Sequence, residues 1–143
     1  MIHTDYIRLN RILAGFLFVF SFIIYYDTMA STVSYWDCGE FIAVSKTLGV
    51  PHPPGSPFFL LLGRIFSMFP INEDIAFRVN LISPLVSASA VMLLYLIVVK
   101  VVTSWRGQIR TTGDGLVAFG GAAVGALTFA FTDSHWFNPV EAE

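Results

Sequence analysis

Charged residues are scarce in this chain, and their scarcity excludes several classes of protein. Asp, Glu, Lys and Arg make up 13 % of the 143 residues, whereas 55 % are hydrophobic. A soluble domain of this length needs far more polar surface. The formal net charge is −2 and the basic residues are scattered, so nucleic acid is not an expected partner. The composition indicates a membrane protein.

Cysteine is almost absent as well. The single cysteine, Cys38, excludes a disulfide within the chain and cannot make a thiolate zinc site alone. We interpret it as a small buried apolar residue. The sequence also lacks a metal signature, because two carboxylates at i and i+3 are weak evidence without further ligands. We therefore expect no cofactor and no metal ligands, with a divalent ion left open.

Three long apolar runs are present, over about residues 10–27, 78–102 and 115–132. Each is close to the roughly 20 residues that a membrane-spanning helix needs. Pro84 should kink the second run near one end. For the first run, a cleavable signal peptide is the alternative, since arginines precede it. The predicted fold is all-α: a polytopic transmembrane helical bundle that forms the N-terminal part of a larger multi-span domain.

The basic residues of the short loops predict the orientation of this bundle. Lys and Arg favour the cytoplasmic side, and they precede the first run and follow the second. The N-terminus is therefore expected in the cytoplasm. The segment 28–77 and the tail after the third run are expected on the external face.

The external segment 28–77 shows signals of ordered structure. Ser34 and Asp37 have the spacing of a capping box, which predicts a helix over about 36–48. Gly49 should end this helix in a left-handed conformation. A second helix should begin at Pro57, capped by the preceding serine. With about 13 residues it is too short to span, so we expect it along the interface or re-entering the membrane.

Three side chains of this segment are candidates for chemistry. Asp37 and Glu40, at i and i+3, can share one helix face and could bind a cation or share a proton. Asp37 has the alternative of being only a helix cap. His52 lies in a proline-rich turn, where it is a proton carrier, a ligand or a hydrogen-bonding loop residue.

The run "SYWDCGEFIAVSKTLGVPHPPGSPFFLLLGRIF" resembles the first external loop of a bacterial membrane-protein family long labelled by a domain of unknown function. That family is grouped with protein O-mannosyltransferase-like enzymes of the GT-C glycosyltransferase superfamily. The motifs "WDCGEF", "HPPG" and "GR" carry the resemblance, and "VEAE" in the tail is similar to the family's next external motif. Family members are several times longer, so we expect an N-terminal fragment that is inactive alone.

The resemblance implies a transferase in the bacterial inner membrane. It would move a sugar, expected to be mannose, from a polyprenyl phosphate to a protein Ser or Thr hydroxyl on the external, periplasmic face. Membrane lipid, the lipid-linked sugar and the acceptor protein are the expected partners. Asp37 occupies the position of the candidate base, with Glu40 as a second catalytic carboxylate. The expected substrate-binding residues are Trp36, His52, Arg64, Glu141 and Glu143.

Two other classes of protein fit the same acidic loop. A transporter or flippase-like protein would use these carboxylates to bind an ion, but such proteins usually carry ionisable groups within their spans. The three runs have none near their centres. A non-catalytic membrane subunit would use the loop to dock a partner.

Overall fold

The computed structural model describes residues 2–34, 37–53, 56–107 and 109–140. It is helical and contains three helical stretches long and apolar enough to cross a membrane, at Asp5–Thr28, Ile75–Arg106 and Thr112–Ala130. The predicted all-α bundle with three candidate spans is thereby confirmed. The elements are α1 (Ile2–Thr28), α2 (Cys38–Thr47), α3 (Pro57–Met68), α4 (Ile75–Asn80), α5 (Ile82–Arg106), α6 (Thr112–Gly115), the π-helix η1 (Leu116–Gly120), α7 (Gly121–Ala130) and α8 (Asp133–Val140).

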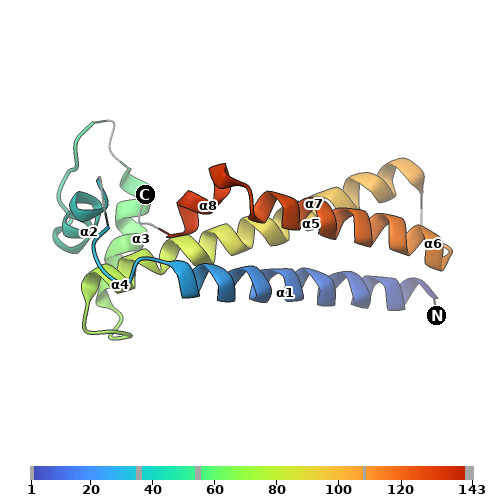
Figure 1. Ribbon diagram of the computed structural model, residues 1–143, viewed down its shortest axis with the longest axis horizontal. Coiled ribbons are helices and arrows are strands. Elements are labelled where there is room, and N and C mark those ends of the chain that lie inside the picture. The colour runs from blue at the N-terminus through green and yellow to red at the C-terminus, as the bar shows by residue number, and fades with distance from the viewer. Residues whose placement is uncertain (1, 35–36, 54–55, 108, 141–143) are drawn as a thin grey trace.

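The long helices lie side by side with alternating direction (Figure 1). The start of α1 and the short α6 lie at one end of the bundle, and α2, α3 and α4 lie at the other. We call this second end the loop end. Small side chains line the packed interface, where Ala88, Ala122 and Ala126 are almost completely buried. Small residues let helix backbones approach closely, as is typical of helices in membranes.

The second candidate span begins earlier than predicted and is interrupted near its start. Asp74 caps α4, because its Oδ1 accepts the backbone N–H of Ala76 at 2.8 Å. The helix breaks at Leu81, three residues before Pro84. Proline has no N–H to donate to the carbonyl of residue i−4, here Asn80, and its ring crowds that carbonyl. Pro84 is therefore tolerated in the first turn of the new helix α5.

Two local predictions for α2 were wrong. The capping box of Ser34 and Asp37 does not form, because the Ser34 hydroxyl has no hydrogen-bond partner among the described residues and α2 begins only at Cys38. Asp37 takes the N-cap position instead, but it has helical dihedral angles (φ −78°, ψ −6°) and its side chain makes no capping hydrogen bond. N-cap residues normally adopt extended angles that turn the side chain toward the first N–H groups. At the other end, Leu48 rather than Gly49 is left-handed (φ 54°). The N–H of Gly49 bonds to the carbonyl of Val44 at 3.1 Å, as in a Schellman motif one residue earlier than expected.

The α3 helix runs across the direction of α1 and α5 (Figure 1). Pro57 is its first residue, as predicted, but the predicted cap was wrong, because the side chain of Ser56 makes no capping hydrogen bond. Phe58, Leu61 and Ile65 form an exposed apolar face, whereas Gly63 on the opposite face is buried against Ser45 of α2. A Cβ added at Gly63 would lie 2.7 Å from the Cβ of Ser45. Only glycine lets these two helices approach so closely.

Tyr25 joins α1 to the end of α7. It is fully buried, and its hydroxyl donates a hydrogen bond of 2.9 Å to the carbonyl of Ala130. That carbonyl belongs to the last turn of α7, where no further helical N–H is available. The Tyr25 ring also packs edge-on against Trp136 of α8. One side chain thus connects three helices at the loop-end half of the bundle.

We expect Tyr25→Phe to lower the free energy of unfolding by about 1 kcal/mol, because the carbonyl of Ala130 loses its donor while the ring packing remains. Tyr26→Phe is the matched control, since the hydroxyl of this half-exposed neighbour makes no hydrogen bond to another helix among the described residues and the ring contact with Phe77 is kept. Denaturant titration in mixed micelles measures both variants. Equal stability of the two would contradict the role assigned to Tyr25.

We expect Gly63→Ala to destabilise the chain by about 1–3 kcal/mol, because the new methyl group overpacks the contact between α2 and α3. Adding Ser45→Gly should restore most of this loss by removing the atoms in its way. Gly15→Ala, where nothing lies within 4 Å of the added carbon, is the control. The same titration measures all four proteins, and a double variant no better than Gly63→Ala would disprove the contact.

Candidate functional site

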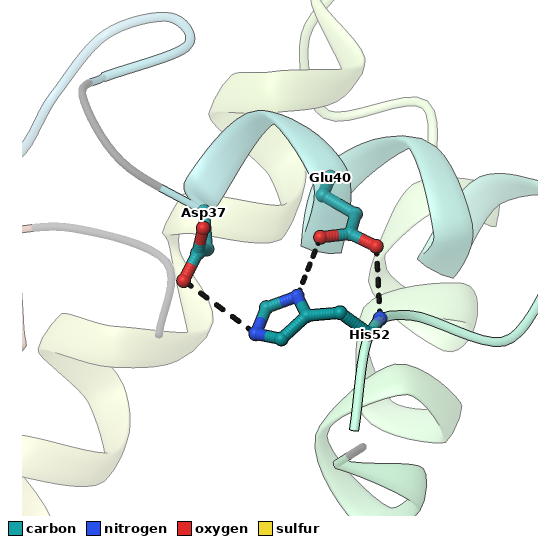
Figure 2. Close-up of side chains that lie close together, drawn as sticks. All are labelled: Asp37, Glu40 and His52. Atoms are coloured by element: carbon teal, nitrogen blue, oxygen red, sulfur yellow. Dashed lines mark hydrogen bonds and ion pairs between the residues drawn. The ribbon is translucent and has the colours of Figure 1, made fainter. Parts of the chain in front are cut away.

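Asp37, Glu40 and His52 meet at the loop end of the bundle (Figure 2). Asp37 holds the N-cap position of α2 and Glu40 lies in its first turn, so both carboxylates emerge at the start of one helix. His52 comes from the loop between α2 and α3, twelve residues after Glu40. One ligand atom from each residue lies within 4.8 Å of the others. We call these three residues the carboxylate–histidine cluster.

Glu40 holds His52 with both of its carboxylate oxygens (Figure 2). Oε1 accepts the backbone N–H of His52 at 2.9 Å, and Oε2 lies 2.7 Å from the ring nitrogen Nδ1. An ionised carboxylate only accepts hydrogen bonds, so Nδ1 carries a proton and donates it. The ring packs beside Phe41, with 6.1 Å between the ring centroids. Glu40 therefore sets both the position and the tautomer of His52.

The other ring nitrogen faces Asp37. Nε2 of His52 lies 3.7 Å from Oδ2 of Asp37, which is too long for a hydrogen bond but close enough for an ion pair when the ring is protonated. The side chains of Asp37, His52 and Glu40 are 58 %, 46 % and 40 % exposed. The cluster is thus open to solvent and to a substrate.

Each partner shifts the pKa of the other. The hydrogen bond with the Glu40 carboxylate, together with its charge, raises the pKa of His52 above the ordinary 6.5. The hydrogen bonds donated by the ring and the backbone of His52 lower the pKa of Glu40 below the ordinary 4.5. Between these two values both groups are charged, and the pair is at its strongest.

The structure answers the question of whether Asp37 is only a helix cap. Its carboxylate makes no capping hydrogen bond to α2, although its backbone carbonyl accepts the N–H of Phe41 at 3.0 Å. The side chain points toward His52 instead (Figure 2). The Asp37 carboxylate is consequently available to accept a proton or to bind a cation.

Arg64, another predicted site residue, is not part of the carboxylate–histidine cluster. Arg64, on α3, donates a hydrogen bond to the backbone carbonyl of Lys46 in the last turn of α2. It thereby supplies a donor where the helix leaves carbonyls unpaired. Within the described ranges, Arg64 makes no ion pair with Glu40. Trp36, Glu141 and Glu143 lie outside the described residues, so their proposed contacts with substrate stay predictions.

Asn80 is a positioning residue that the sequence reasoning missed. Its side chain is buried and donates to the carbonyls of Ala30 at 2.9 Å and Thr32 at 3.0 Å. These bonds fasten the linker between α1 and α2 to the end of α4, just ahead of Asp37. The signal in the sequence was an amide side chain at the start of an apolar run, where a buried polar group needs partners.

A cavity of about 610 Å³ lies at the opposite end of the bundle from the cluster. Residues of α1 and α5 line it, among them Tyr6, Asn10, Lys100 and Thr103. It shares no lining residue with the carboxylate–histidine cluster, so the two are separate features.

The fold places the exposed carboxylate–histidine cluster at one end of a bundle whose described residues include three helical stretches long and apolar enough to cross a membrane. The chain belongs to the family described as the protein O-mannosyl-transferase TMEM260 N-terminal domain, whose model matches residues 37–143. The match begins at Asp37 and includes Glu40 and His52. No solved structure gives a significant match.

Two curated relatives are similar to this chain. The protein O-mannosyl-transferase tmem260 of Dictyostelium discoideum is 32 % identical over 130 residues, which cover 89 % of this chain and 14 % of the relative. The protein O-mannosyl-transferase TMEM260 of Mus musculus is 38 % identical over 87 residues, which cover 60 % of this chain and 12 % of the relative. Both organisms are eukaryotic, so the bacterial origin stays a prediction.

We expect Glu40→Gln to lower the pKa of His52 toward its ordinary value, because a neutral amide no longer stabilises the imidazolium. The hydrogen bond between Glu40 and His52 also makes the stability of the protein depend on pH. In the wild type the pair's contribution to stability is lost as pH rises through the raised His52 pKa, or falls through the lowered Glu40 pKa.

Carbon-13 NMR of labelled histidine rings, recorded over pH in the presence of a chelator, measures this shift. Glu73→Gln, on an exposed glutamate outside the cluster, should leave the His52 titration unchanged. An identical His52 pKa in the wild type and Glu40→Gln would show that the hydrogen bond between them does not persist in solution.

Proposed function

We propose that this chain is the N-terminal part of a membrane enzyme that transfers mannose from a polyprenyl phosphate to a Ser or Thr hydroxyl of a protein. Membership of the O-mannosyl-transferase family and the names of both relatives support this class of reaction. The observation that carries the proposal for this chain is the geometry of the Asp37 carboxylate. It is exposed, makes no capping hydrogen bond to α2 and faces His52, which is hydrogen-bonded to Glu40.

Asp37 is the proposed general base. A Ser or Thr hydroxyl is a weak nucleophile, and a placed carboxylate that takes its proton as the new C–O bond forms typically contributes about 10²- to 10⁴-fold. The bond between the sugar and the phosphate breaks in the same step, and the lipid phosphate leaves as an anion. Glu40 acts through His52, which it keeps 3.7 Å from Asp37.

The place of the cluster suits this reaction. The donor is anchored in the bilayer by its lipid, whereas the acceptor is a water-soluble hydroxyl. The cluster lies at the end of three helices that are long and apolar enough to span, and its side chains are open to solvent. Lipid phosphate and acceptor protein can both reach such a position. The exposed apolar face of α3 would rest on the bilayer beside it.

The external face and the bacterial inner membrane are parts of the same proposal. Loop charge supports a cytoplasmic N-terminus, which places the loop end outside. Trp36, Arg64, Glu141 and Glu143 remain proposed substrate contacts. One N–H of Arg64 is bonded to the carbonyl of Lys46, and the other N–H groups of its guanidinium would be the ones to contact the phosphate.

We expect Asp37→Asn in the full-length protein to lower mannose transfer by roughly a hundredfold, because asparagine keeps the size of the side chain but cannot accept the hydroxyl proton. Membranes given labelled polyprenyl phosphate mannose and a Ser/Thr-rich acceptor measure the rate. Asp27→Asn, an exposed aspartate at the end of α1 outside the cluster, should retain wild-type transfer.

Equal rates for Asp37→Asn and the wild type would remove Asp37 from the base role. A wild type that transfers no sugar from any lipid-linked donor would overturn the transferase itself and return the cluster to an ion-handling role in transport.

A further inference from the structure

The carboxylate–histidine cluster has an unbalanced charge for the proposed reaction. Asp37 and Glu40 contribute two negative charges, and His52 contributes at most one positive charge. Among the described residues neither carboxylate pairs with a lysine or arginine, and Arg64 is turned to the carbonyl of Lys46. A lipid phosphate brought to this position would be repelled. A further cation is needed beside the carboxylates.

The cluster has the donor atoms to hold that cation. Two carboxylates and one imidazole nitrogen offer atoms that all lie within 4.8 Å of one another. Metal–ligand bonds of about 2.0–2.2 Å place bound atoms roughly 3–4 Å apart, so small side-chain rotations close the site. His52 supplies the third ligand group, which the sequence did not place beside the two carboxylates.

We propose that Asp37, Glu40 and His52 bind a divalent cation of the manganese or zinc class, which takes a donor phosphate oxygen at an open coordination position. The binding site rests on the cluster alone, and only the phosphate contact rests on the proposed function. The imidazole suits zinc and the two carboxylates suit manganese, whereas magnesium and calcium are bound mainly through oxygen ligands. Exposure of all three groups leaves room for water or phosphate as further ligands.

The cation is compatible with Asp37 as the base. A carboxylate has two oxygens, so one can bind the ion while the other accepts the hydroxyl proton. The ion neutralises charge on the phosphate as the bond between sugar and phosphate breaks. The loop between α2 and α3 brings His52 beside both carboxylates at the start of α2.

The test is Mn²⁺ binding to the full-length protein in lipid nanodiscs after removal of metal with a chelator. Loss of the free-Mn²⁺ signal in electron paramagnetic resonance reports binding, and added Zn²⁺ should compete. We expect binding to the wild type to be weakened by roughly 10- to 100-fold or more in each of Asp37→Asn, Glu40→Gln and His52→Gln. Glu73→Gln should bind as the wild type does.

A second measurement needs no variant that might unfold. Bound Mn²⁺ should broaden the ring signals of His52 in the wild type much more strongly than those of His135 on α8, which is not part of the cluster. Absence of Mn²⁺ and Zn²⁺ binding by the wild type, or binding that all three variants retain, would overturn the metal site.

Transfer activity separates this proposal from the proposed function. Mannose transfer that a chelator does not reduce, in a protein without bound metal, would overturn the ion and leave the transferase standing. Binding of Mn²⁺ through the cluster in a protein that transfers no mannose would support the site and overturn the transferase.

Discussion

The packing of α1 against α5 and α7 is the constraint on which the rest of the structure depends. It brings the end of α1 and the beginning of α4 to the same end of the bundle, so all of the segment between them must fold there. Within a bilayer, helices satisfy their own backbone hydrogen bonds. Long irregular stretches of backbone are then expected at the ends of the bundle, where water is available, and the loop end is one of them.

Within that segment, the carboxylate–histidine cluster forms where the start of α2 contacts the loop between α2 and α3. The first turn of α2 presents both carboxylates, and the loop after α2 returns His52 to them. Both carboxylate oxygens of Glu40 accept hydrogen bonds from His52, one from the backbone N–H and one from Nδ1. The ring is therefore held in one orientation, with Nε2 toward Asp37. A cluster with one fixed tautomer is suited to handle either a proton or a metal ion at a defined atom.

The sequence predicted the apolar helices, but it missed both ends of α2 and the contacts that depend on tertiary geometry. Apolar runs indicated the three candidate spans, and Pro57 indicated the start of α3. The dihedral angles of Asp37 decide whether it caps α2, and spacing alone does not reveal them. The spacing likewise places Glu40 on a helix face but does not show that it reaches His52. In the sequence Arg64 has no evident partner, so it was predicted to bind phosphate. The fold shows that it donates a hydrogen bond to the carbonyl of Lys46, 18 residues away.

The contact of Asn80 with Ala30 and Thr32 has a consequence for biosynthesis. Ala30 precedes Asn80 by 50 residues, so a ribosome delivers the linker well before the side chain that anchors it. Until α4 emerges, the nascent segment with Asp37 and Glu40 has no fixed attachment to the bundle. The linker before α2 is therefore anchored only after the second candidate span begins to emerge, and a chain truncated before Asn80 would lack that anchor.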